Sequence, residues 1–450
     1  MLSTLLTLYL AALLFIARSS YRHQETDRGF LVANRSLSTW GVAASATVGV
    51  IDSTAILIMF GSVLLFGPGG IGIWFGYFIA TVCLALLAPR FYDHVQTYDL
   101  HTLSEFFRFR LGPNTERIFL VVVTLFSIGL IIGIYSINLA IFEHFLGLGV
   151  VSATIVSFLV TLSYVLLGGF RALVRTDILQ FAIVLSLIAI LIWFIPGTER
   201  VSAGTIPDWF SGAFWAIAPV IFFQNMIKPA AWQPILGARS RATARSGMWL
   251  AVLCNFLIII PAVYVSFAFA ATLPTAAPDQ VLLDAIGPVL PELAGPLVFI
   301  LLFAALMSSL DSIIFFVASN LVRYSYPYLA LKYLTQIGLT RIAIAFVALT
   351  TSLLAILVPD FVTFGFAIVP LVGIMAIPFL AAMFYDFTAI DSIVTFSCIV
   401  SLLVFIYLFV FPPANYLWNI LPILLCGASL LTYLLLPDKK TDQTGNKRSN

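Results

Sequence analysis

Charged residues are scarce in this chain. Only 9% of its 450 residues are Asp, Glu, Lys or Arg, whereas a soluble globular domain carries about 25%. Hydrophobic residues make up 61%. Apolar runs of about 20 residues, each long enough to cross a ~30 Å hydrocarbon core, recur from one end to the other. The scarcity of charge therefore excludes a soluble domain and predicts an all-α polytopic membrane protein.

Cysteine and histidine are also sparse. The four cysteines, Cys83, Cys254, Cys398 and Cys426, are scattered through apolar segments, at spacings that suit neither a disulfide framework nor a metal cluster. The four histidines fall in or near connecting segments, whereas a haem or copper protein needs them inside the spans. Because the spans hold no nucleophile–base pair and no metal set, we do not expect an enzyme.

The apolar runs predict about thirteen membrane spans joined by short loops. The longest polar stretch is the C-terminal "PDKKTDQTGNKRSN", so no soluble domain is expected. The predicted spans are 2–17, 38–66, 70–89, 117–142, 150–168, 174–195, 209–234, 246–271, 296–321, 339–358, 361–385, 389–411 and 415–436.

The basic residues gather in alternate connecting segments. All 22 Lys and Arg residues except Arg200 then fall on one side of the membrane. By the positive-inside rule that side is cytoplasmic, which predicts an N-terminus outside and a cytoplasmic C-terminus. The first apolar run has no basic region before it, so we interpret it as an uncleaved helix rather than a signal peptide. The compact loops favour a bacterial inner membrane.

The ninth predicted span contains three serines and an aspartate. Ala305, Ser308, Ser309 and Ser312 recur at i, i+3, i+4 and i+7, which places them on one helix face with Asp311 at its edge. Serines alone can bond back to their own helix or let helices pack closely. An ionised Asp311 would cost roughly 2.5–3.5 kcal/mol at the bilayer centre, so it needs a partner or a cation.

The second predicted span, "SATVGVIDSTAILIMFGS", is expected to be interrupted. Asp52 and Ser53 follow Gly49, and glycine costs a helix about 1 kcal/mol relative to alanine. A break at this depth is tolerated where the backbone lines a cavity or is buried in protein. The alternative is that Asp52 merely pairs with a cation on a neighbouring helix.

The seventh predicted span, "APVIFFQNMIKPAAWQP", is also expected to be interrupted. Gln224, Asn225 and Lys228 precede Pro229, and proline removes a backbone donor and breaks or kinks a helix. Lys228 either takes part in a pocket at this break or extends to the membrane surface.

Interrupted helices in matching positions of two halves are typical of secondary transporters with inverted repeats. The interrupted spans here lie five spans apart, and hydroxyl, carboxylate and carbonyl oxygens suit a hard alkali cation. Asp177, in "RTDILQF", either belongs to such a site or only compensates the dipole in the first turn of the sixth span. A bound Na⁺ or a transferable proton is expected to compensate the polar cluster of the ninth span.

Five stretches in order along the chain resemble patterns of the solute:sodium symporter family, whose fold is of the LeuT type. They are "DRGFLVANRSLSTWGVAAS", "GGIGIWFGY", "TLSEFFRFRLG", "LLGGFRALVRTDILQF" and "AALMSSLDS". The resemblance implies one transmembrane transporter domain, 1–450, with a 5+5 inverted-repeat core. Its parts would be the first span and loop (1–37), the first repeat (38–195), the second repeat (209–385), peripheral spans (389–436) and a cytoplasmic tail (437–450).

The resemblance also implies a sodium site where the ninth span meets the break in the second. The ninth span would give the carbonyl of Ala305 and the hydroxyls of Ser308 and Ser309. The second span would give the carbonyls of Val48 and Ile51.

A second cation site is expected from the family's "TD" element. It would combine Asp177 with Asp311 and Ser312 of the ninth span. Asp311 stands in place of a hydroxyl and would serve either a second Na⁺ or a proton.

The solute site is expected at the two breaks, and its residues would be Asp52, Ser53, Gln224, Asn225 and Lys228. The chain departs from the family here, because Gln233 is followed by Pro234 rather than arginine and Lys228 replaces an uncharged polar residue. A lysine suggests a solute that carries a carboxylate, such as an amino acid.

The leading hypothesis is a sodium-coupled symporter that imports a small organic solute by alternating access, with Na⁺ as coupling ion. One alternative keeps the fold but couples transport to H⁺ through Asp311 or Asp52. Another is a solute sensor without net transport, which the short polar tail disfavours. The partners expected are the solute and the lipid bilayer, with neither nucleic acid nor an obligatory protein partner.

Overall fold

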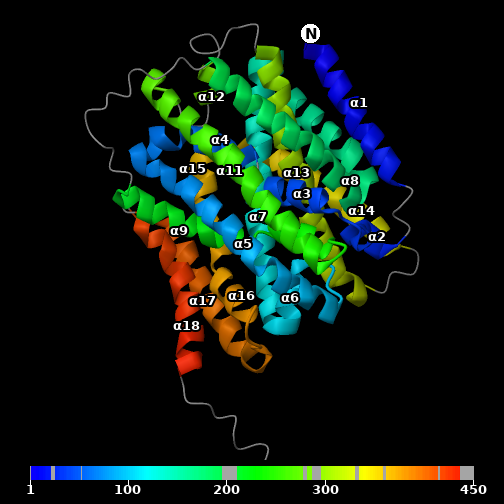
Figure 1. The fold of residues 1–450 in the computed structure, drawn as a ribbon, viewed down its shortest axis with the longest axis vertical. Helices are drawn as coiled ribbons and strands as arrows, with labels where there is room; N and C mark the ends of the chain where they lie inside the picture. Colours follow the sequence, from blue (N-terminus) through cyan, green and yellow to red (C-terminus); the bar gives the residue numbers. More distant parts are fainter. Residues whose placement is uncertain are drawn as a thin grey trace, which may run out of the picture.

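The computed structural model describes residues 2–21, 26–51, 53–194, 210–276, 281–285, 295–329, 334–357, 361–413 and 416–435. Within these ranges the regular elements are helices, apart from one isolated β-bridge (Figure 1). Seven of the described helices are long and apolar enough to cross a membrane, and shorter apolar helices accompany them. The predicted all-α membrane fold is confirmed.

The longer elements near the N-terminus are α1 (Leu2–Tyr21), α3 (Thr39–Val50), α4 (Ser53–Phe66), α5 (Ile71–Tyr98), α7 (Pro113–Leu146) and α8 (Val150–Phe194). The later ones are α9 (Gly212–Ile227), α10 (Pro229–Leu236), α11 (Arg241–Thr272), α13 (Gly295–Ser325), α14 (Gln336–Leu354), α15 (Phe361–Gly373), α16 (Ala376–Ala382), α17 (Asp391–Val410) and α18 (Leu421–Leu435). The short elements are α2 (Asp27–Val32), η1 (Ala33–Arg35), η2 (Gly67–Gly70), α6 (Leu103–Arg110), α12 (Val281–Asp284), η4 (Tyr326–Tyr328), η5 (Ala355–Leu357), η6 (Thr388–Ile390) and η7 (Tyr416–Ile420).

Helices lie over every predicted span, and two of these regions differ in detail from the prediction. The fifth and sixth predicted spans are the two arms of α8, which meet at a sharp bend at Gly169 (φ 57°, ψ 179°) instead of at a separate connecting loop. Glycine adopts a positive φ without a steric penalty, so the chain changes direction within one residue. The eleventh span is divided into α15 and α16.

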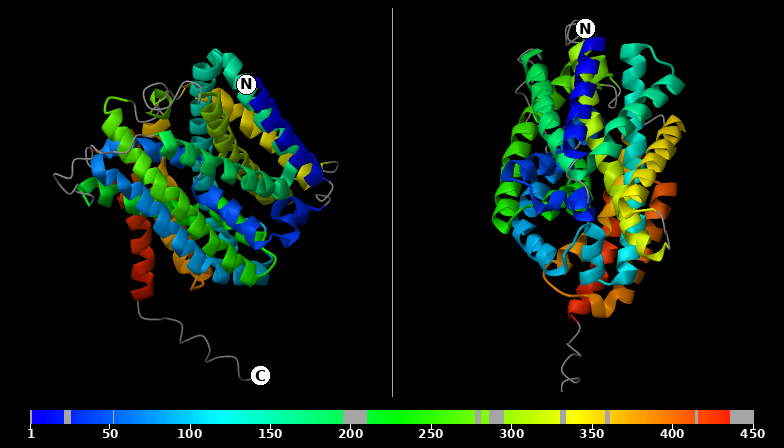
Figure 2. Two further views of the ribbon diagram at one scale, coloured as in Figure 1. Left: turned by 45° about the horizontal axis from the view of Figure 1, so that its top comes forward. Right: turned by 90° about the vertical axis from the view of Figure 1, so that its right-hand side faces the viewer.

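Helix α13 lies in the middle of the molecule (Figures 1 and 2). It contacts α7, α8 and α14 along its length, and also α1, α3 and α4. Within its most apolar window 89% of residues are buried, against 28% in the peripheral helix α17. The polar residues of α13 therefore face protein rather than lipid.

The two predicted interruptions are confirmed. Helix α3 ends at Val50, Ile51 leaves the helical conformation (φ −96°, ψ 84°), and α4 begins at Ser53. Helix α9 ends before Lys228, which is extended (φ −62°, ψ 117°), and Pro229 opens α10. Proline fits this first position because its missing N–H would have no partner there anyway.

The two interrupted helices are bonded to each other at the ends away from their breaks and approach closely beside the breaks themselves. The Leu37 N–H donates to the Gly237 carbonyl (3.0 Å), and the Arg239 N–H donates to the Leu37 carbonyl (3.3 Å). A Cβ added at Gly49 of α3 would lie 2.5 Å from the carbonyl oxygen of Ala230 in α10. The backbones approach so closely here that only glycine fits.

The peripheral helix α17 is attached to the core by a buried carboxylate. Asp391 accepts hydrogen bonds from the backbone N–H groups of Asn114 (2.9 Å) and Thr115 (2.8 Å), and from the Thr115 hydroxyl (2.7 Å). These are first-turn donors of α7, which lack partners within their own helix. Asp391 therefore caps one helix from the start of another.

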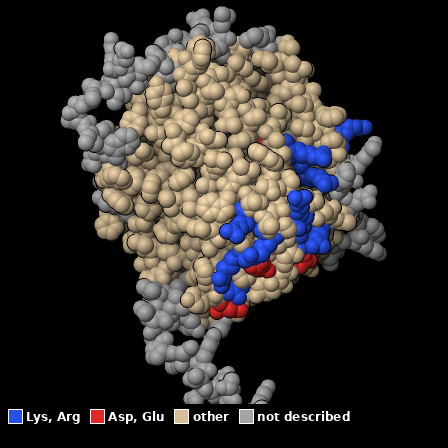
Figure 3. Space-filling model, in the orientation of Figure 1, with Lys and Arg blue, Asp and Glu red and all other residues tan. Residues whose placement is uncertain are grey.

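Basic side chains gather at one end of the molecule. Figure 3 shows them at the lower right of the face, over the end that carries α2 and α6 in Figure 1, whereas most of that face is uncharged. We call the region formed by α2, η1, α6 and the adjoining ends of α5 and α13 the basic end.

Candidate functional site

The end of α3 supplies the carbonyl groups predicted for the sodium site. Val48 and Ile51 lie in or just after its last turn, and the final carbonyls of a helix lack donors within that helix. The Val50 carbonyl between them accepts a hydrogen bond from Lys228 Nζ (3.4 Å). The break therefore leaves backbone oxygens at the place where the sequence predicts cation ligands.

Lys228 is buried at the junction of α9 and α10, with only 3% of its surface exposed. The alternative in which it extends to the membrane surface is therefore wrong. Its ammonium group lies at the C-terminal end of α3, where the helix dipole is negative and stabilises a cation. A fixed positive charge thus stands at the meeting point of the two breaks.

Two buried amides precede this junction in the last turns of α9. Asn225 donates to the Ile221 carbonyl (2.8 Å), while its own oxygen and that of Gln224 have no hydrogen-bond partner among the described residues. These acceptors remain available for a polar solute. The predicted solute residue Asp52 lies outside the described residues, and Ser53 begins α4.

The α13 residues predicted to bind cations are all buried. Ala305, Ser308 and Ser309 have at most 4% of their surface exposed, and Ser312 has 9%. Because α13 contacts α3 directly, the two halves of the predicted sodium site stand on adjoining helices.

Asp177 joins α8 to this region. Its carboxylate accepts a hydrogen bond from the Ser308 hydroxyl of α13 (3.4 Å), and α8 also contacts α3. The interpretation that Asp177 only compensates a first-turn dipole is wrong, because α8 continues through it and the residue is 2% exposed. Helices α3, α8 and α13 therefore contact one another in this region.

Asp311 is completely buried, and neither carboxylate oxygen has a hydrogen-bond partner among the described residues. In that part of the chain no ion pair to Asp177 or Asp311 is found. A buried carboxylate without compensation is strongly unfavourable. The donor set consists of oxygens alone, which fits a hard cation such as Na⁺.

Sequence reasoning missed three residues around these carboxylates. The Tyr164 hydroxyl donates to the Met307 carbonyl (3.3 Å), and the Tyr9 hydroxyl donates to the Ala304 carbonyl (3.5 Å). Gln180 donates to Tyr9 Oη (3.0 Å). Gln180 could have been found from its place three residues after Asp177 on one helix face. The residues next to Tyr9 in the sequence give no indication that it lies near these carboxylates.

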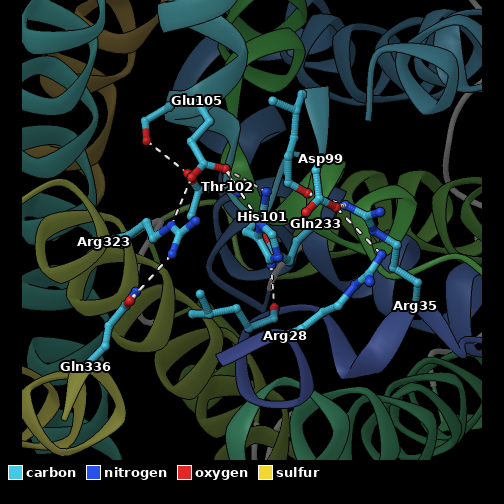
Figure 4. A network of polar contacts seen from close by, with 12 residues as sticks. Arg28, Arg35, Asp99, His101, Thr102, Glu105, Gln233, Arg323 and Gln336 are labelled. Carbon is cyan, nitrogen blue, oxygen red and sulfur yellow. Dashed lines mark hydrogen bonds and ion pairs between the residues drawn. The ribbon is translucent and has the colours of Figure 1, made fainter. Parts of the chain in front are cut away.

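A polar network stabilises the basic end (Figure 4). Glu105 pairs with Arg323 of α13 (2.9 Å), accepts from the His101 N–H (2.6 Å) and caps α6. Asp99, just after α5, pairs with Arg35 of η1 (2.7 Å). The network connects segments that belong to different halves of the chain.

His101 makes this network sensitive to pH. Burial lowers the pKa of its imidazole below the ordinary value of 6.5, and Arg323 acts in the same direction, although Glu105 opposes them. At mildly acidic pH this imidazole therefore binds more protons in the unfolded chain, and its contribution to the free energy of unfolding should fall as the pH drops below about 6.5. We expect His101→Gln to flatten this decline in thermal unfolding temperature.

The matched control is His144→Gln, because His144 is exposed at the end of α7. It should keep the decline seen in the unchanged protein. If His101→Gln kept it too, another group would be responsible.

Comparison with known proteins supports this architecture. Residues 30–203 match the sequence model of the sodium:solute symporter family. A Na⁺-coupled sialic acid symporter, solved in a substrate-bound outward-open state, superposes with a TM-score of 0.79 at 17% identity, covering 97% of this chain and 98% of that one. No curated protein sequence matches significantly.

Two more distant transporters share the fold. Mhp1, a nucleobase-cation-symport-1 family transporter, superposes with a TM-score of 0.55 at 14% identity, over 90% of this chain and 94% of its own. The manganese transporter of Eremococcus coleocola gives 0.53 at 15% identity, over 90% and 89%.

The chain thus shares its fold with these transporters, and seven of its described helices are long and apolar enough to cross a membrane. The resemblance to the sodium:solute symporter family is confirmed by the match over residues 30–203.

Proposed function

We propose that the protein is a sodium-coupled symporter that imports a small organic solute by alternating access. The observation that carries this proposal is the buried carboxylate of Asp311, which has no hydrogen-bond partner among the described residues and lies on α13, the helix that contacts both α3 and α4. A cation bound there would compensate both Asp311 and the neighbouring Asp177.

The main sodium site would consist of the carbonyls of Val48, Ile51 and Ala305 and the hydroxyls of Ser308 and Ser309. Sodium bound there would join α3 to α13 across the break, since each helix supplies part of the oxygen set. The neighbouring residues Asp177, Asp311 and Ser312 would form the second cation site.

The solute would bind between the two breaks, against Asp52, Ser53, Gln224, Asn225 and Lys228. The buried ammonium of Lys228 at the end of α3 favours a solute with a carboxylate, such as an amino acid. The amide oxygens of Gln224 and Asn225 would accept hydrogen bonds from its donor groups.

Residues 38–195 and 209–385 would be the two inverted repeats, because each begins with one of the interrupted helices. The basic end would face the cytoplasm and the N-terminus would lie outside, as the positive-inside rule predicts for a bacterial inner membrane. The membrane potential would then contribute about 2.3 kcal/mol per charge per 100 mV to import.

The test is uptake into proteoliposomes that contain the purified protein. Labelled amino acids and small carboxylates are offered under an inward gradient of Na⁺, of H⁺ or of K⁺ alone. Accumulation that needs the Na⁺ gradient supports the proposal, and Lys228→Gln should then weaken uptake of the anionic solute most. Accumulation driven by H⁺ without Na⁺ would instead identify a proton-coupled symporter, and saturable binding without accumulation would identify a sensor.

A further inference from the structure

A buried amide lies beside the proposed second cation site, and its oxygen has no hydrogen-bond partner among the described residues. Gln180 follows Asp177 by three residues on α8, so both side chains lie on one face of that helix. Gln180 is completely buried. Its nitrogen donates to Tyr9 Oη (3.0 Å), while its oxygen has no hydrogen-bond partner among the described residues.

Tyr9 of α1 determines the orientation of this amide, that is, whether its nitrogen or its oxygen faces Tyr9. The hydroxyl proton of Tyr9 is donated to the Ala304 carbonyl (3.5 Å). A tyrosine hydroxyl has one proton, so toward Gln180 it can only accept. The amide nitrogen must therefore face Tyr9, and the amide oxygen must face away from it.

Within the described ranges, no ion pair compensates the carboxylates near Gln180. Asp311, with two unpartnered oxygens, interacts electrostatically with Tyr9. The Ser308 hydroxyl already donates to Asp177. A buried acceptor without a partner costs roughly 1–3 kcal/mol. The Gln180 oxygen and the two Asp311 oxygens are three such acceptors in the surroundings of Tyr9. One cation among them would satisfy all three.

We propose that the Gln180 amide oxygen is a further ligand of the second cation site, with Na⁺ as the ion, and that Tyr9 is a positioning residue that orients it. This inference rests on the proposed function, because it assumes that a cation binds beside Asp177 and Asp311. Helix α1, which precedes the proposed repeats, thereby takes part in forming a coupling-ion site.

The experiment is equilibrium binding of radioactive sodium to the full-length protein in detergent. Gln180→Leu removes the ligand oxygen and should weaken one of two sodium-binding phases by about 10- to 100-fold. Tyr9→Phe keeps the ring but releases the amide, so it should weaken the same phase to a smaller extent. Gln180→Glu restores an oxygen ligand and should recover the binding that leucine loses.

Two control variants exclude a general loss of structure. Asn255→Leu removes another buried amide with an unpartnered oxygen, on α11, and Tyr135→Phe removes a buried hydroxyl without a hydrogen-bond partner among the described residues. Both should bind sodium as the unchanged protein does.

The outcomes separate this inference from the proposed function. Sodium binding that Ser309→Ala reduces but Gln180→Leu leaves unchanged would overturn the inference alone. Absence of sodium binding in the unchanged protein would overturn both. If Gln180→Leu and Asn255→Leu lost binding equally, the effect would be one of general stability, and the assignment of Gln180 as a ligand would be wrong.

Discussion

Sodium chloride is expected to raise the thermal unfolding temperature of the purified protein above its value in potassium chloride at equal ionic strength, and Ser309→Ala should abolish the difference. A ligand that binds only the folded state, present at ~100 times its Kd, adds about 2.7 kcal/mol to the free energy of unfolding. Ser309 is buried on the face of α13 that carries the predicted ligands. Removal of its hydroxyl therefore removes part of the oxygen set.

Ser319→Ala is the matched control for this measurement, because it removes a buried hydroxyl from the same helix at a position outside the predicted site. It should leave the sodium effect intact. Equal unfolding temperatures of the unchanged protein in the two salts, with a strong dependence on pH, would favour proton coupling instead.

Gly49→Leu is expected to cause a large loss of stability and of transport. A Cβ at this position already lies 2.5 Å from the Ala230 carbonyl oxygen, which belongs to the backbone of α10 and cannot rotate away. Overpacking costs about 1–3 kcal/mol for modest insertions, and more when the backbone must move. The larger leucine should separate the two interrupted helices.

The unfolding temperature in detergent and sodium-driven uptake measure this effect, and Gly49→Ala should fall between leucine and glycine. Gly149→Ala is the control, since nothing lies within 4 Å of a Cβ there. Normal stability of Gly49→Leu would mean that α3 and α10 can move apart at no cost, contrary to the close contact described above.

Much of the candidate site was predictable because its signals are local. The serines of α13 share a face through helical periodicity, and Pro229 breaks the seventh span by removing a donor, so both follow from neighbouring residues. The break after α3 follows similarly from Gly49 and the polar residues behind it. Such features depend on a few consecutive residues and survive tertiary folding.

The remainder depends on contacts between distant segments. The burial of Lys228 is decided by α3, and the orientation of Gln180 is decided by Tyr9, which lies 171 positions away in the chain. The sequence predicted that one span ends at 168 and the next begins at 174, but it did not predict that the connection is a single bend at Gly169, because a turn of one residue leaves no polar loop. Hydropathy and periodicity contain no information about these relations.

The bend in α8 has a consequence for how the protein is made. A straight helix of its 45 residues would be about 68 Å long, more than twice the ~30 Å hydrocarbon core. The bend at Gly169 therefore allows the segments 150–168 and 170–194 to enter the bilayer as a pair of antiparallel spans. Arg171 and Arg175 follow the bend at once and bond to Ser36 and to Ser19 and Ser20. During membrane insertion these two charged side chains would keep the bend in water until they form their hydrogen bonds with the earlier segments.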